Sequence, residues 1–296
     1  MSTVIEPVGA PVVELGMPLI GGALGRVQGA GTDGLEEAES ETRSDKLSAV
    51  RKGKIGSVHS WELVTAVDGP GTRLTVFLAG CPLRCLYCHN PDTMEMRRGT
   101  DVTAKELLGR VKRYRGVMKA TGGGLTVSGG EPLMQPAFVK RLMRGAKEIG
   151  VHTAIDTSGN LGALCTDEML DDIDLVLLDV KSGDPDTYRK VTGRELEPTL
   201  QFGRRLAARG DTEVWIRFVL VPGLTDDVEN VEIVAQYVAS LGECVTRVEV
   251  LPFHQMGRDK WVELGMTYEL EDTQPPSPEL VERVRDQFRS RGLQVF

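Results

Sequence analysis

The sequence predicts an α/β protein with a partial (β/α)6 TIM-like barrel, preceded by a disordered N-terminal extension. Two observations predict this class. Short apolar runs alternate with helical patterns along the chain, which is typical of βα units around a parallel sheet. Polar clusters follow directly after these runs, and the C-terminal strand ends carry the active site in βα barrels. Six units would leave the barrel partial and its mouth wide, whereas a doubly wound sheet is the alternative arrangement.

Composition narrows the class of protein. The chain has 296 residues, an ordinary apolar content of 41% and a net charge of −8, which argues against nonspecific binding to nucleic acid. No apolar run approaches the ~20 residues that span a bilayer. The cysteines number five, three of them clustered, which does not indicate a disulfide framework. A reducing, cytoplasmic setting and a monomer are therefore expected.

Two regions are expected: a flexible extension over residues 1–50 and a folded domain over residues 51–296. Val12 to Leu24 is apolar but interrupted by Pro18 and several glycines, with no basic segment before it, so it does not resemble a secretion signal. Glu36 to Asp45 is acidic and polar and has almost nothing to bury.

Six short apolar runs are predicted to be strands. The run at residues 74–78 is the clearest of them, because it is mainly apolar, as expected of a strand that is buried on both faces. An extended segment at residues 58–64 and a tight turn from Asp68 to Arg73 precede the first of them. The predicted strands are residues 74–78, 125–128, 151–155, 175–178, 214–221 and 248–251.

Helical spacing of apolar residues fills the gaps between these strands. Thr103 and Glu106 form a capping box at the start of one helix, and Ser277 followed by Pro278 marks the start of another. Glycines at positions 122, 150 and 242 follow three of the helices, as expected at helix C-termini. The predicted helices are residues 103–121, 138–149, 167–170, 197–209, 231–241 and 278–288.

The most informative stretch is the loop after the first strand, where Cys81, Cys85 and Cys88 have the spacing C-x3-C-x2-C. Thiolates this close in sequence can converge on one metal centre. A tetrahedral zinc site and an ordinary iron–sulfur cluster each need four ligands, so three cysteines indicate a centre with one position open. A structural zinc site with His89 as fourth ligand is the alternative, although the adjacent Cys88 and His89 would have difficulty reaching one ion together.

Other polar residues follow the later strands: Ser128 to Glu131, Asp156 to Gly159, Asp179 to Lys181, and His254. Each has a simpler interpretation as a loop, a helix cap, a solvated lysine or a structural histidine. A carboxylate at the end of an apolar strand is costly unless it caps a helix or meets a cation. Their shared position at strand ends favours a common functional site.

These motifs resemble a known family. The three cysteines, with Tyr87 before the last of them, resemble the signature of the radical S-adenosylmethionine (SAM) superfamily, and Gly129-Gly130-Glu131 resembles its GGE segment. Finer motifs from about Ile55 to the C-terminus resemble the pyruvate formate-lyase activating enzymes. They lie at residues 67–73, 87–90, 122–131, 156–159, 178–181, 221–223 and 251–261.

The resemblance implies a set of cofactors and ligands. Cys81, Cys85 and Cys88 would hold a [4Fe-4S] cluster whose fourth iron binds SAM. A monovalent cation beside the SAM carboxylate would be bound by Asp156, Thr157 and Asp179. Glu131 is expected to receive the SAM amine. The remaining implied SAM contacts are Tyr87, Cys88, His89, Gly130, Asp179, Val180, Lys181, Ser182, Gly183 and His254.

The resemblance also implies a reaction and partners. One-electron cleavage of SAM would give a 5′-deoxyadenosyl radical that removes a hydrogen from a glycine of pyruvate formate-lyase, a reaction of anaerobic metabolism. The turn from Asp68 to Arg73 would face that glycine, and a flavodoxin or a ferredoxin would supply the electron. No nucleic acid or membrane is expected as a partner. The alternatives are activation of another glycyl-radical enzyme and, in a different class, a non-catalytic iron–sulfur or zinc scaffold.

Overall fold

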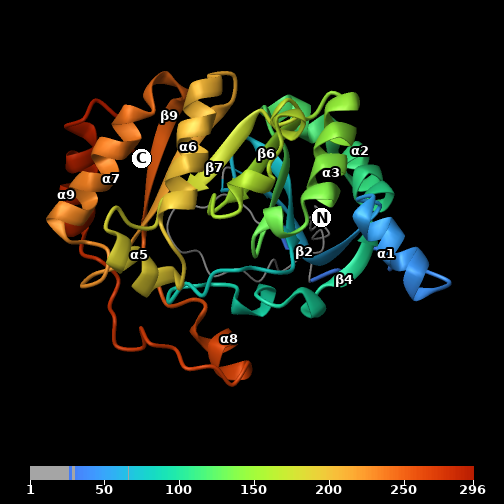
Figure 1. The fold of residues 1–296 in the computed structure, drawn as a ribbon, viewed down its shortest axis with the longest axis horizontal. Helices are drawn as coiled ribbons and strands as arrows, with labels where there is room; N and C mark the ends of the chain where they lie inside the picture. Colours follow the sequence, from blue (N-terminus) through green and yellow to red (C-terminus); the bar gives the residue numbers. More distant parts are fainter. Residues whose placement is uncertain (1–26, 29–30, 66) are drawn as a thin grey trace, which may run out of the picture.

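A computed structural model describes residues 27–28, 31–65 and 67–296, and its central feature is a curved sheet (Figure 1). Six neighbouring strands of this sheet run parallel and appear in chain order, which confirms the predicted partial barrel. They are β3 (Thr72–Leu78), β5 (Gly124–Gly129), β6 (His152–Thr157), β7 (Leu175–Asp179), β8 (Glu213–Leu220) and β9 (Val245–Pro252).

Antiparallel strands extend the sheet beside β3. The long strand β2 (Ile55–Thr65) pairs with β3, with β4 (Thr100–Thr103) and with β1 (Val27–Gln28). At the other edge, Val295 forms a parallel bridge with Val248 of β9. Among the residues that the structure describes, no pairing joins β9 back to β1 or β2, so the barrel stays open on that side.

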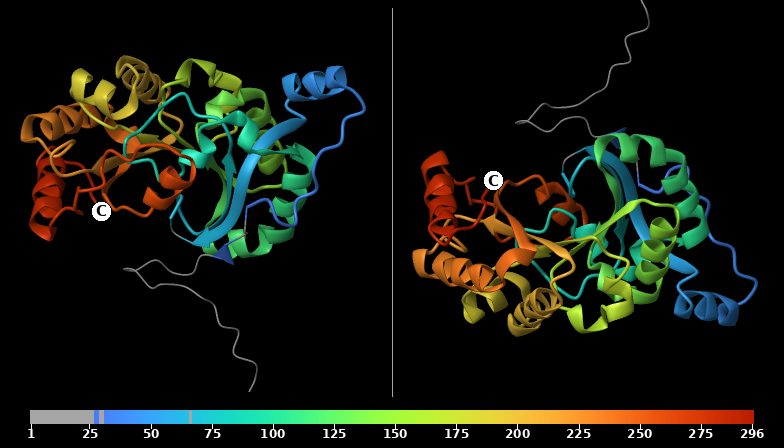
Figure 2. Two further views of the ribbon diagram at one scale, coloured as in Figure 1. Left: turned by 90° about the horizontal axis from the view of Figure 1, so that it is seen from below. Right: turned by 90° about the horizontal axis from the view of Figure 1, so that it is seen from above.

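Most of the helices cover the outer face of the sheet (Figures 1 and 2), whereas the short helix α8 (Arg258–Glu263) lies away from the sheet, below it in Figure 1. Alternate strand residues such as Val76, Val127 and Ile216 point outward and are fully buried in the main core. The helices are α1 (Arg43–Arg51), α2 (Ala104–Thr121), α3 (Pro136–Glu148), α4 (Asp167–Leu170), α5 (Pro185–Thr192), α6 (Glu197–Arg209), α7 (Val228–Ser240), α8 (Arg258–Glu263) and α9 (Pro278–Arg289). Short 3-10 turns are η1 (Pro91–Thr93), η2 (Met96–Arg98), η3 (Pro132–Met134), η4 (Gly162–Leu164) and η5 (Gly242–Cys244).

Local sequence explains the helix boundaries. The Thr103 hydroxyl accepts a hydrogen bond from the backbone N–H of Glu106, and the Ser277 hydroxyl accepts one from Leu280, so both predicted caps are formed. Gly122 ends α2 in the left-handed region at a φ of 68°. None of the helices in the described ranges is long and apolar enough to cross a membrane.

The folded part begins earlier than the predicted boundary at Val50. The indole N–H of Trp61 donates to the carbonyl of Asp33 at 3.2 Å, and Leu35 packs against the main core. The residues from Arg43 to Arg51 form α1. Composition hides these contacts because several of them are made by backbone carbonyls, those of Gly31, Asp33 and Gly34, just before the acidic segment. The rest of the predicted extension, residues 1–26 and 29–30, lies outside the described residues.

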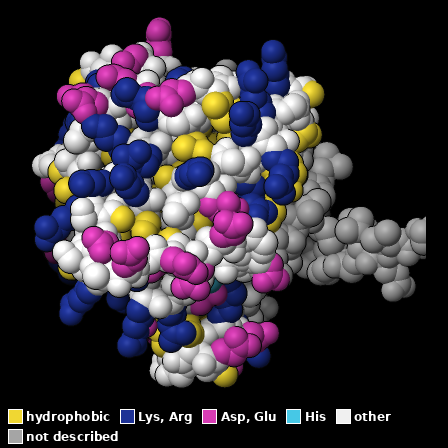
Figure 3. Space-filling view, turned by 90° about the vertical axis from the view of Figure 1, so that its right-hand side faces the viewer, with side chains coloured by type: hydrophobic (Ala, Val, Ile, Leu, Met, Phe, Trp, Pro, Cys, Tyr) yellow, Lys and Arg dark blue, Asp and Glu magenta, His cyan; other side chains and the backbone are white. Residues whose placement is uncertain are grey.

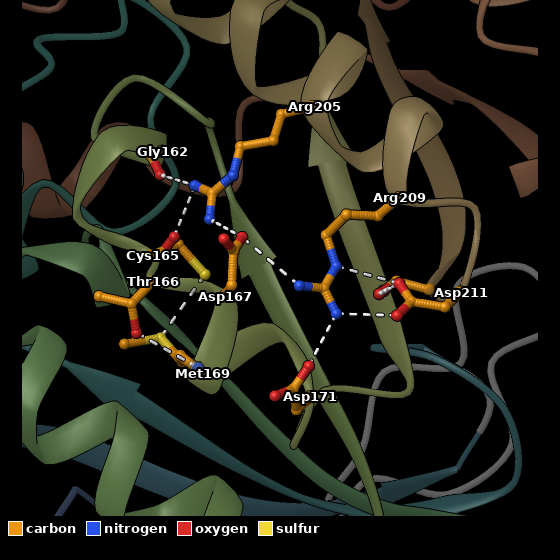
Figure 4. A network of polar contacts seen from close by, with 10 residues as sticks. Gly162, Cys165, Thr166, Asp167, Met169, Asp171, Arg205, Arg209 and Asp211 are labelled. Atoms are coloured by element: carbon orange, nitrogen blue, oxygen red, sulfur yellow. Dashed lines mark hydrogen bonds and ion pairs between the residues drawn. The ribbon is translucent and has the colours of Figure 1, made fainter.

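A network of ion pairs fixes α4 to α6 on the outside of the barrel (Figure 4). Arg209 of α6 contacts Asp171 at 2.8 Å and Asp211 at 2.8 Å, and its Nη1 lies 3.4 Å from Asp167. Arg205, one turn earlier, donates to the carbonyl of Cys165 at 2.6 Å. This network lies on the outer shell and contains none of the predicted site residues.

Candidate active site

The cysteine loop leaves the C-terminal end of β3 and is held on both sides by backbone hydrogen bonds. Gly80, at a φ of 96°, donates to Thr93, and Cys81 donates to Met94 at 3.1 Å. On the other side, Leu86 donates to Val191 at 3.0 Å, which ties the loop to α5. The loop therefore presents its three cysteines from a fixed backbone.

The environment of the three cysteine thiols is consistent with binding of a positively charged metal centre. Burial and, to a smaller extent, the neighbouring Cys85 together raise the pKa of Cys81 and of Cys88 to about 12. Burial also raises the pKa of Cys85. Three thiolates side by side are unfavourable unless a metal centre compensates their charge, and thiolate is the donor that iron–sulfur clusters require. Among the described residues, no group of three or more Cys, His, Asp or Glu side chains lies close enough together to hold a single metal ion, and this includes the three loop cysteines.

A buried lysine lies beside the cysteine loop. The Lys181 ammonium is 2.8 Å from Asp179 and 5.7 Å from the centre of the Tyr87 ring. Burial would lower the pKa of Lys181, but Asp179, Tyr87 and Cys85 hold it well above the usual value. The buried Tyr87 hydroxyl has no hydrogen-bond partner among the described residues, so a bound polar ligand could satisfy it.

The end of β9 closes on the same loop. The rings of His89 and His254 stack with centroids 4.1 Å apart, and Nε2 of His89 lies 3.2 Å from the carbonyl oxygen of His254. The indole N–H of Trp261 donates to the carbonyl of Cys88 at 2.9 Å. These contacts bring the predicted histidine and the cysteine motif together from distant parts of the chain.

The predicted glycine segment packs directly on the cysteine loop. A Cβ atom on Gly130 would lie 2.4 Å from the carbonyl oxygen of Gly80, so only glycine fits there. The Glu131 carboxylate accepts hydrogen bonds from the Thr157 hydroxyl at 2.7 Å and from the backbone N–H of Ser158 at 3.0 Å. It also accepts one from the N–H of Leu133 at 3.1 Å. Glu131 thus joins β5 to β6, and its contact with the SAM amine stays a prediction.

The three residues predicted to bind a cation each have a partner within the protein. Asp156 lies 3.3 Å from Arg217 and accepts a hydrogen bond from the Ser128 hydroxyl. Burial raises the pKa of Asp156 to about 6, although Arg217 acts in the opposite direction. Thr157 donates to Glu131, and Asp179 pairs with Lys181. Cation binding at these residues stays a prediction.

Arg217 is a central residue that sequence reasoning missed. It projects from β8 into the barrel and lies 3.1 Å from Glu249, 3.3 Å from Asp156 and 3.6 Å from Asp68. Burial would lower its pKa, but these carboxylates raise it above the usual value. A lone arginine inside the apolar run from Val214 to Val221 was the available signal.

The turn predicted to face the partner protein is fixed from inside the barrel. The Thr126 hydroxyl donates to the carbonyl of Asp68 at 2.7 Å and accepts from Nε of Arg73. Arg73 also donates to the carbonyl of Pro70 at 3.2 Å, and Arg217 donates to that of Val67 at 2.6 Å. Two buried arginines therefore determine where this turn lies.

The segment from Val180 to Gly183, which follows β7, makes contacts in two different directions. Val180 is buried, and its backbone N–H donates to the backbone carbonyl of Arg217, while Lys181 reaches Tyr87 of the cysteine loop. The Ser182 hydroxyl and the Gly183 N–H instead donate to the amide oxygen of Asn230 on α7, at 2.7 and 2.8 Å. Asn230 was not predicted, and the predicted SAM contacts of Ser182 and Gly183 stay untested.

Comparison with known proteins is consistent with this geometry. Residues 75–232 match the model of the radical SAM superfamily. The chain is 40% identical over 244 residues to pyruvate formate-lyase 1-activating enzyme of Escherichia coli K12, covering 82% of this chain and 98% of the relative. It is 43% identical over 237 residues to pyruvate formate-lyase-activating enzyme of Staphylococcus epidermidis, covering 76% and 92%.

Among solved structures, SuiB of Streptococcus suis bound to the precursor peptide SuiA shares the fold. Its TM-score is 0.57 at 15% identity, with 79% of this chain and 49% of that chain covered. The two activating enzymes are more similar to this chain than SuiB is, because the similarity extends over nearly their whole length at 40% and 43% identity. The chain therefore belongs to the radical SAM superfamily and, within it, to the family of the pyruvate formate-lyase activating enzymes.

Proposed function

We propose that this protein is an enzyme that uses SAM and a [4Fe-4S] cluster to install a glycyl radical on pyruvate formate-lyase. The observation that carries the proposal is the arrangement around the cysteine loop. Lys181, His254 and Gly130 reach this loop from the ends of different strands, and Lys181 lies over the ring of Tyr87 in the loop. A three-cysteine loop with polar groups gathered around it fits a cluster that leaves one position for a ligand.

The residues of the chain would then have distinct tasks. Cys81, Cys85 and Cys88 hold the cluster, which supplies one electron for the cleavage of SAM when it is bound. Lys181, kept charged beside Asp179, offers an ammonium group to an anionic part of SAM, such as its carboxylate. Gly130 lets the ligand approach the backbone closely.

The partners follow from the reaction. The glycine of pyruvate formate-lyase would approach the turn from Asp68 to Arg73, whose position Arg73 and Arg217 fix. A reduced flavodoxin or ferredoxin would supply the electron. A monovalent cation would have to compete with Arg217 for Asp156 and with Lys181 for Asp179. A cytoplasmic setting agrees with the free state of all five cysteines.

The test is anaerobic reconstitution of the protein with iron and sulfide, followed by dithionite and SAM. We expect 5′-deoxyadenosine and methionine from the wild-type protein, and a glycyl-radical signal in electron paramagnetic resonance when pyruvate formate-lyase is added. Replacing Cys85 by Ala should remove the cluster's iron and visible absorption together with SAM cleavage. Cys244→Ser is the matched control, because Cys244 is free and lies outside the loop, so it should retain both.

Each result separates one alternative. Absence of 5′-deoxyadenosine from the reconstituted wild-type protein would contradict an enzymatic function and leave the scaffold interpretation. A glycyl signal in a different glycyl-radical enzyme, and none in pyruvate formate-lyase, would reassign the partner. Cleavage that survives in Cys85→Ala would contradict the ligand assignment.

A further inference from the structure

The outer side of the cysteine loop borders a hollow of about 360 Å³. Its lining comes from the cysteine loop, α5 and the segment around α8, and includes two cations, Arg84 and Lys190, one carboxylate, Glu269, and the apolar side chains of Leu86, Trp261 and Met266. In Figure 1 this region lies at the lower end of the molecule, where α5 and α8 flank the segment that carries the cysteines. Since Arg84 and Leu86 both line it, the hollow lies directly beside the cysteine motif.

The lining of this hollow is close to the cysteines. Leu86 lies between Cys85 and Tyr87 in the chain. The indole N–H of Trp261 donates to the carbonyl of Cys88 at 2.9 Å, and Trp261 is itself buried. An electron that enters at this surface would have one side chain or one hydrogen bond to cross before it reaches the cysteine loop. The rate of electron transfer falls steeply with distance. The surface beside Leu86 and Trp261 is therefore a favourable place for an electron donor to bind.

Arg84 and Lys190, which line the hollow, and Arg194, which contacts the cysteine loop, are exposed cations without a carboxylate partner among the described residues. Nη1 of Arg84 donates to the carbonyl of Cys81 at 2.8 Å, and Nε of Arg194 donates to that of Pro82 at 2.7 Å. Neither arginine, nor Lys190, forms an ion pair with any described residue, whereas nearby Arg189 pairs with Asp186 and Glu195. The cysteine loop, α5 and the segment after α5 thus each contribute one unpaired cation to this surface, in a chain with a net charge of −8.

We propose that this surface, defined by Arg84, Lys190, Arg194 and the hollow beside Trp261, docks an acidic one-electron carrier protein. The proposal rests on the proposed function, since reductive cleavage of SAM needs an electron from outside. The carrier is oxidised by one electron, the cluster held by the cysteines is reduced by one, and the sulfonium of SAM is the final acceptor. The cations would steer an acidic surface to the loop, and a small hollow suits the limited, transient contact that is typical of redox partners.

A second basic surface offers a comparison. Arg51, Lys52 and Lys140 border a hollow of about 760 Å³ between α1 and α3, and Figure 3 shows Lys and Arg side chains gathered on that face. This face lies at the opposite end of the molecule from α5 (Figures 1 and 2). None of the residues that line it belongs to the cysteine loop. The α1–α3 surface therefore has basic side chains that could attract an acidic partner, but it is not close to the cysteines.

The experiment compares Lys190→Glu with Lys52→Glu, two exposed lysines on these two surfaces. Binding of flavodoxin to the reconstituted enzyme would be measured anaerobically by calorimetry at low and high salt, and cleavage of SAM would be driven either by reduced flavodoxin or by dithionite. For Lys190→Glu we expect binding roughly tenfold weaker at low salt and a smaller difference at high salt. Flavodoxin-driven cleavage at limiting donor should fall with it, while dithionite-driven cleavage should match the wild type. Lys52→Glu should behave as the wild type throughout.

Two outcomes would overturn the docking proposal. One is wild-type affinity and salt dependence in Lys190→Glu, and the other is an equal or larger loss in Lys52→Glu, which would move the donor to the α1–α3 surface. Failure of the proposed function looks different, because the wild-type protein would then give no 5′-deoxyadenosine with dithionite. The calorimetric comparison of the two variants tests docking in either case.

Discussion

Two arginines of this protein each face three carboxylates, but in opposite surroundings. Arg217 lies inside the barrel among Asp68, Asp156 and Glu249, and the four side chains are only 10–16% exposed. Arg209 lies on the outer shell (Figure 4), where the side chains of its partners Asp167, Asp171 and Asp211 are 57–71% exposed. The two groups have similar distances, so exposure is the main difference between them.

That difference assigns the two groups different tasks. Charges inside a protein lose their hydration, and their mutual attraction repays this cost only when every partner is present. The Arg217 group therefore adds little net stability, but it fixes the relative positions of the partner-facing turn, β6, β8 and β9. Exposed carboxylates keep their water, so the Arg209 group is neither costly nor strongly stabilising.

The largest expected effect comes from replacing Arg217 by Met. This change leaves Asp68, Asp156 and Glu249 buried without their cation, and we expect the free energy of unfolding to fall by about 3–5 kcal/mol. Urea unfolding would measure it. Arg217→Lys keeps the charge but not the planar fork, so it should lose less stability and still release the turn. A loss below about 1 kcal/mol in Arg217→Met would contradict the coupling inferred for this group.

Much of the fold could be predicted because its signals are local. All six parallel strands were found from apolar runs, and the caps at Thr103 and Ser277 were read from single residues. The helices α1, α5 and α8 were not predicted. Helix α5 is short and rich in charged residues, although Asp184 before it and Gly193 after it were usable signals. Helix α8 has six residues and buries only Trp261, which is too little to make a pattern.

The site could be predicted only in part, for a physical reason. The motifs identify which loops carry chemistry, and the cysteine loop does meet Lys181, His254 and Gly130. The contacts of Arg217 with Asp68 and of Asn230 with Ser182 depend on how distant strands and helices are registered. No local pattern encodes that register, so the residues that position the site were found only in the structure.

An intermediate effect is expected at Asp92, which links β2 to α8 in partly exposed surroundings. Asp92 lies 2.9 Å from His59 and 3.2 Å from Lys260. Burial would raise the pKa of Asp92, but the hydrogen bond and charge of His59 and the charge of Lys260 lower it to about 2. Because the pKa is lower in the folded state, the stabilisation is present above about pH 4 and is lost as the pH falls toward 2.

Asp92→Asn tests this ion group. We expect the variant to lose about 1–2 kcal/mol of unfolding free energy at neutral pH, and the difference from the wild type to shrink below about pH 4. Urea unfolding at a series of pH values would measure it. A difference that stays constant from neutral to acid pH would show that the ionised carboxylate is not what stabilises this link.

The smallest effect is expected at Arg209. In Arg209→Met the carboxylates of Asp171 and Asp211 return to water, so the unfolding free energy should change by at most about 1 kcal/mol. Added salt should remove most of that difference, since exposed charges are screened, whereas the effect of Arg217→Met should persist in salt. Urea unfolding of both variants at low and high salt makes the comparison directly. If Arg209→Met proved as damaging as Arg217→Met, or resisted salt equally, exposure could not be what distinguishes the two groups, and the interior arginine would lose its special role in positioning the turn.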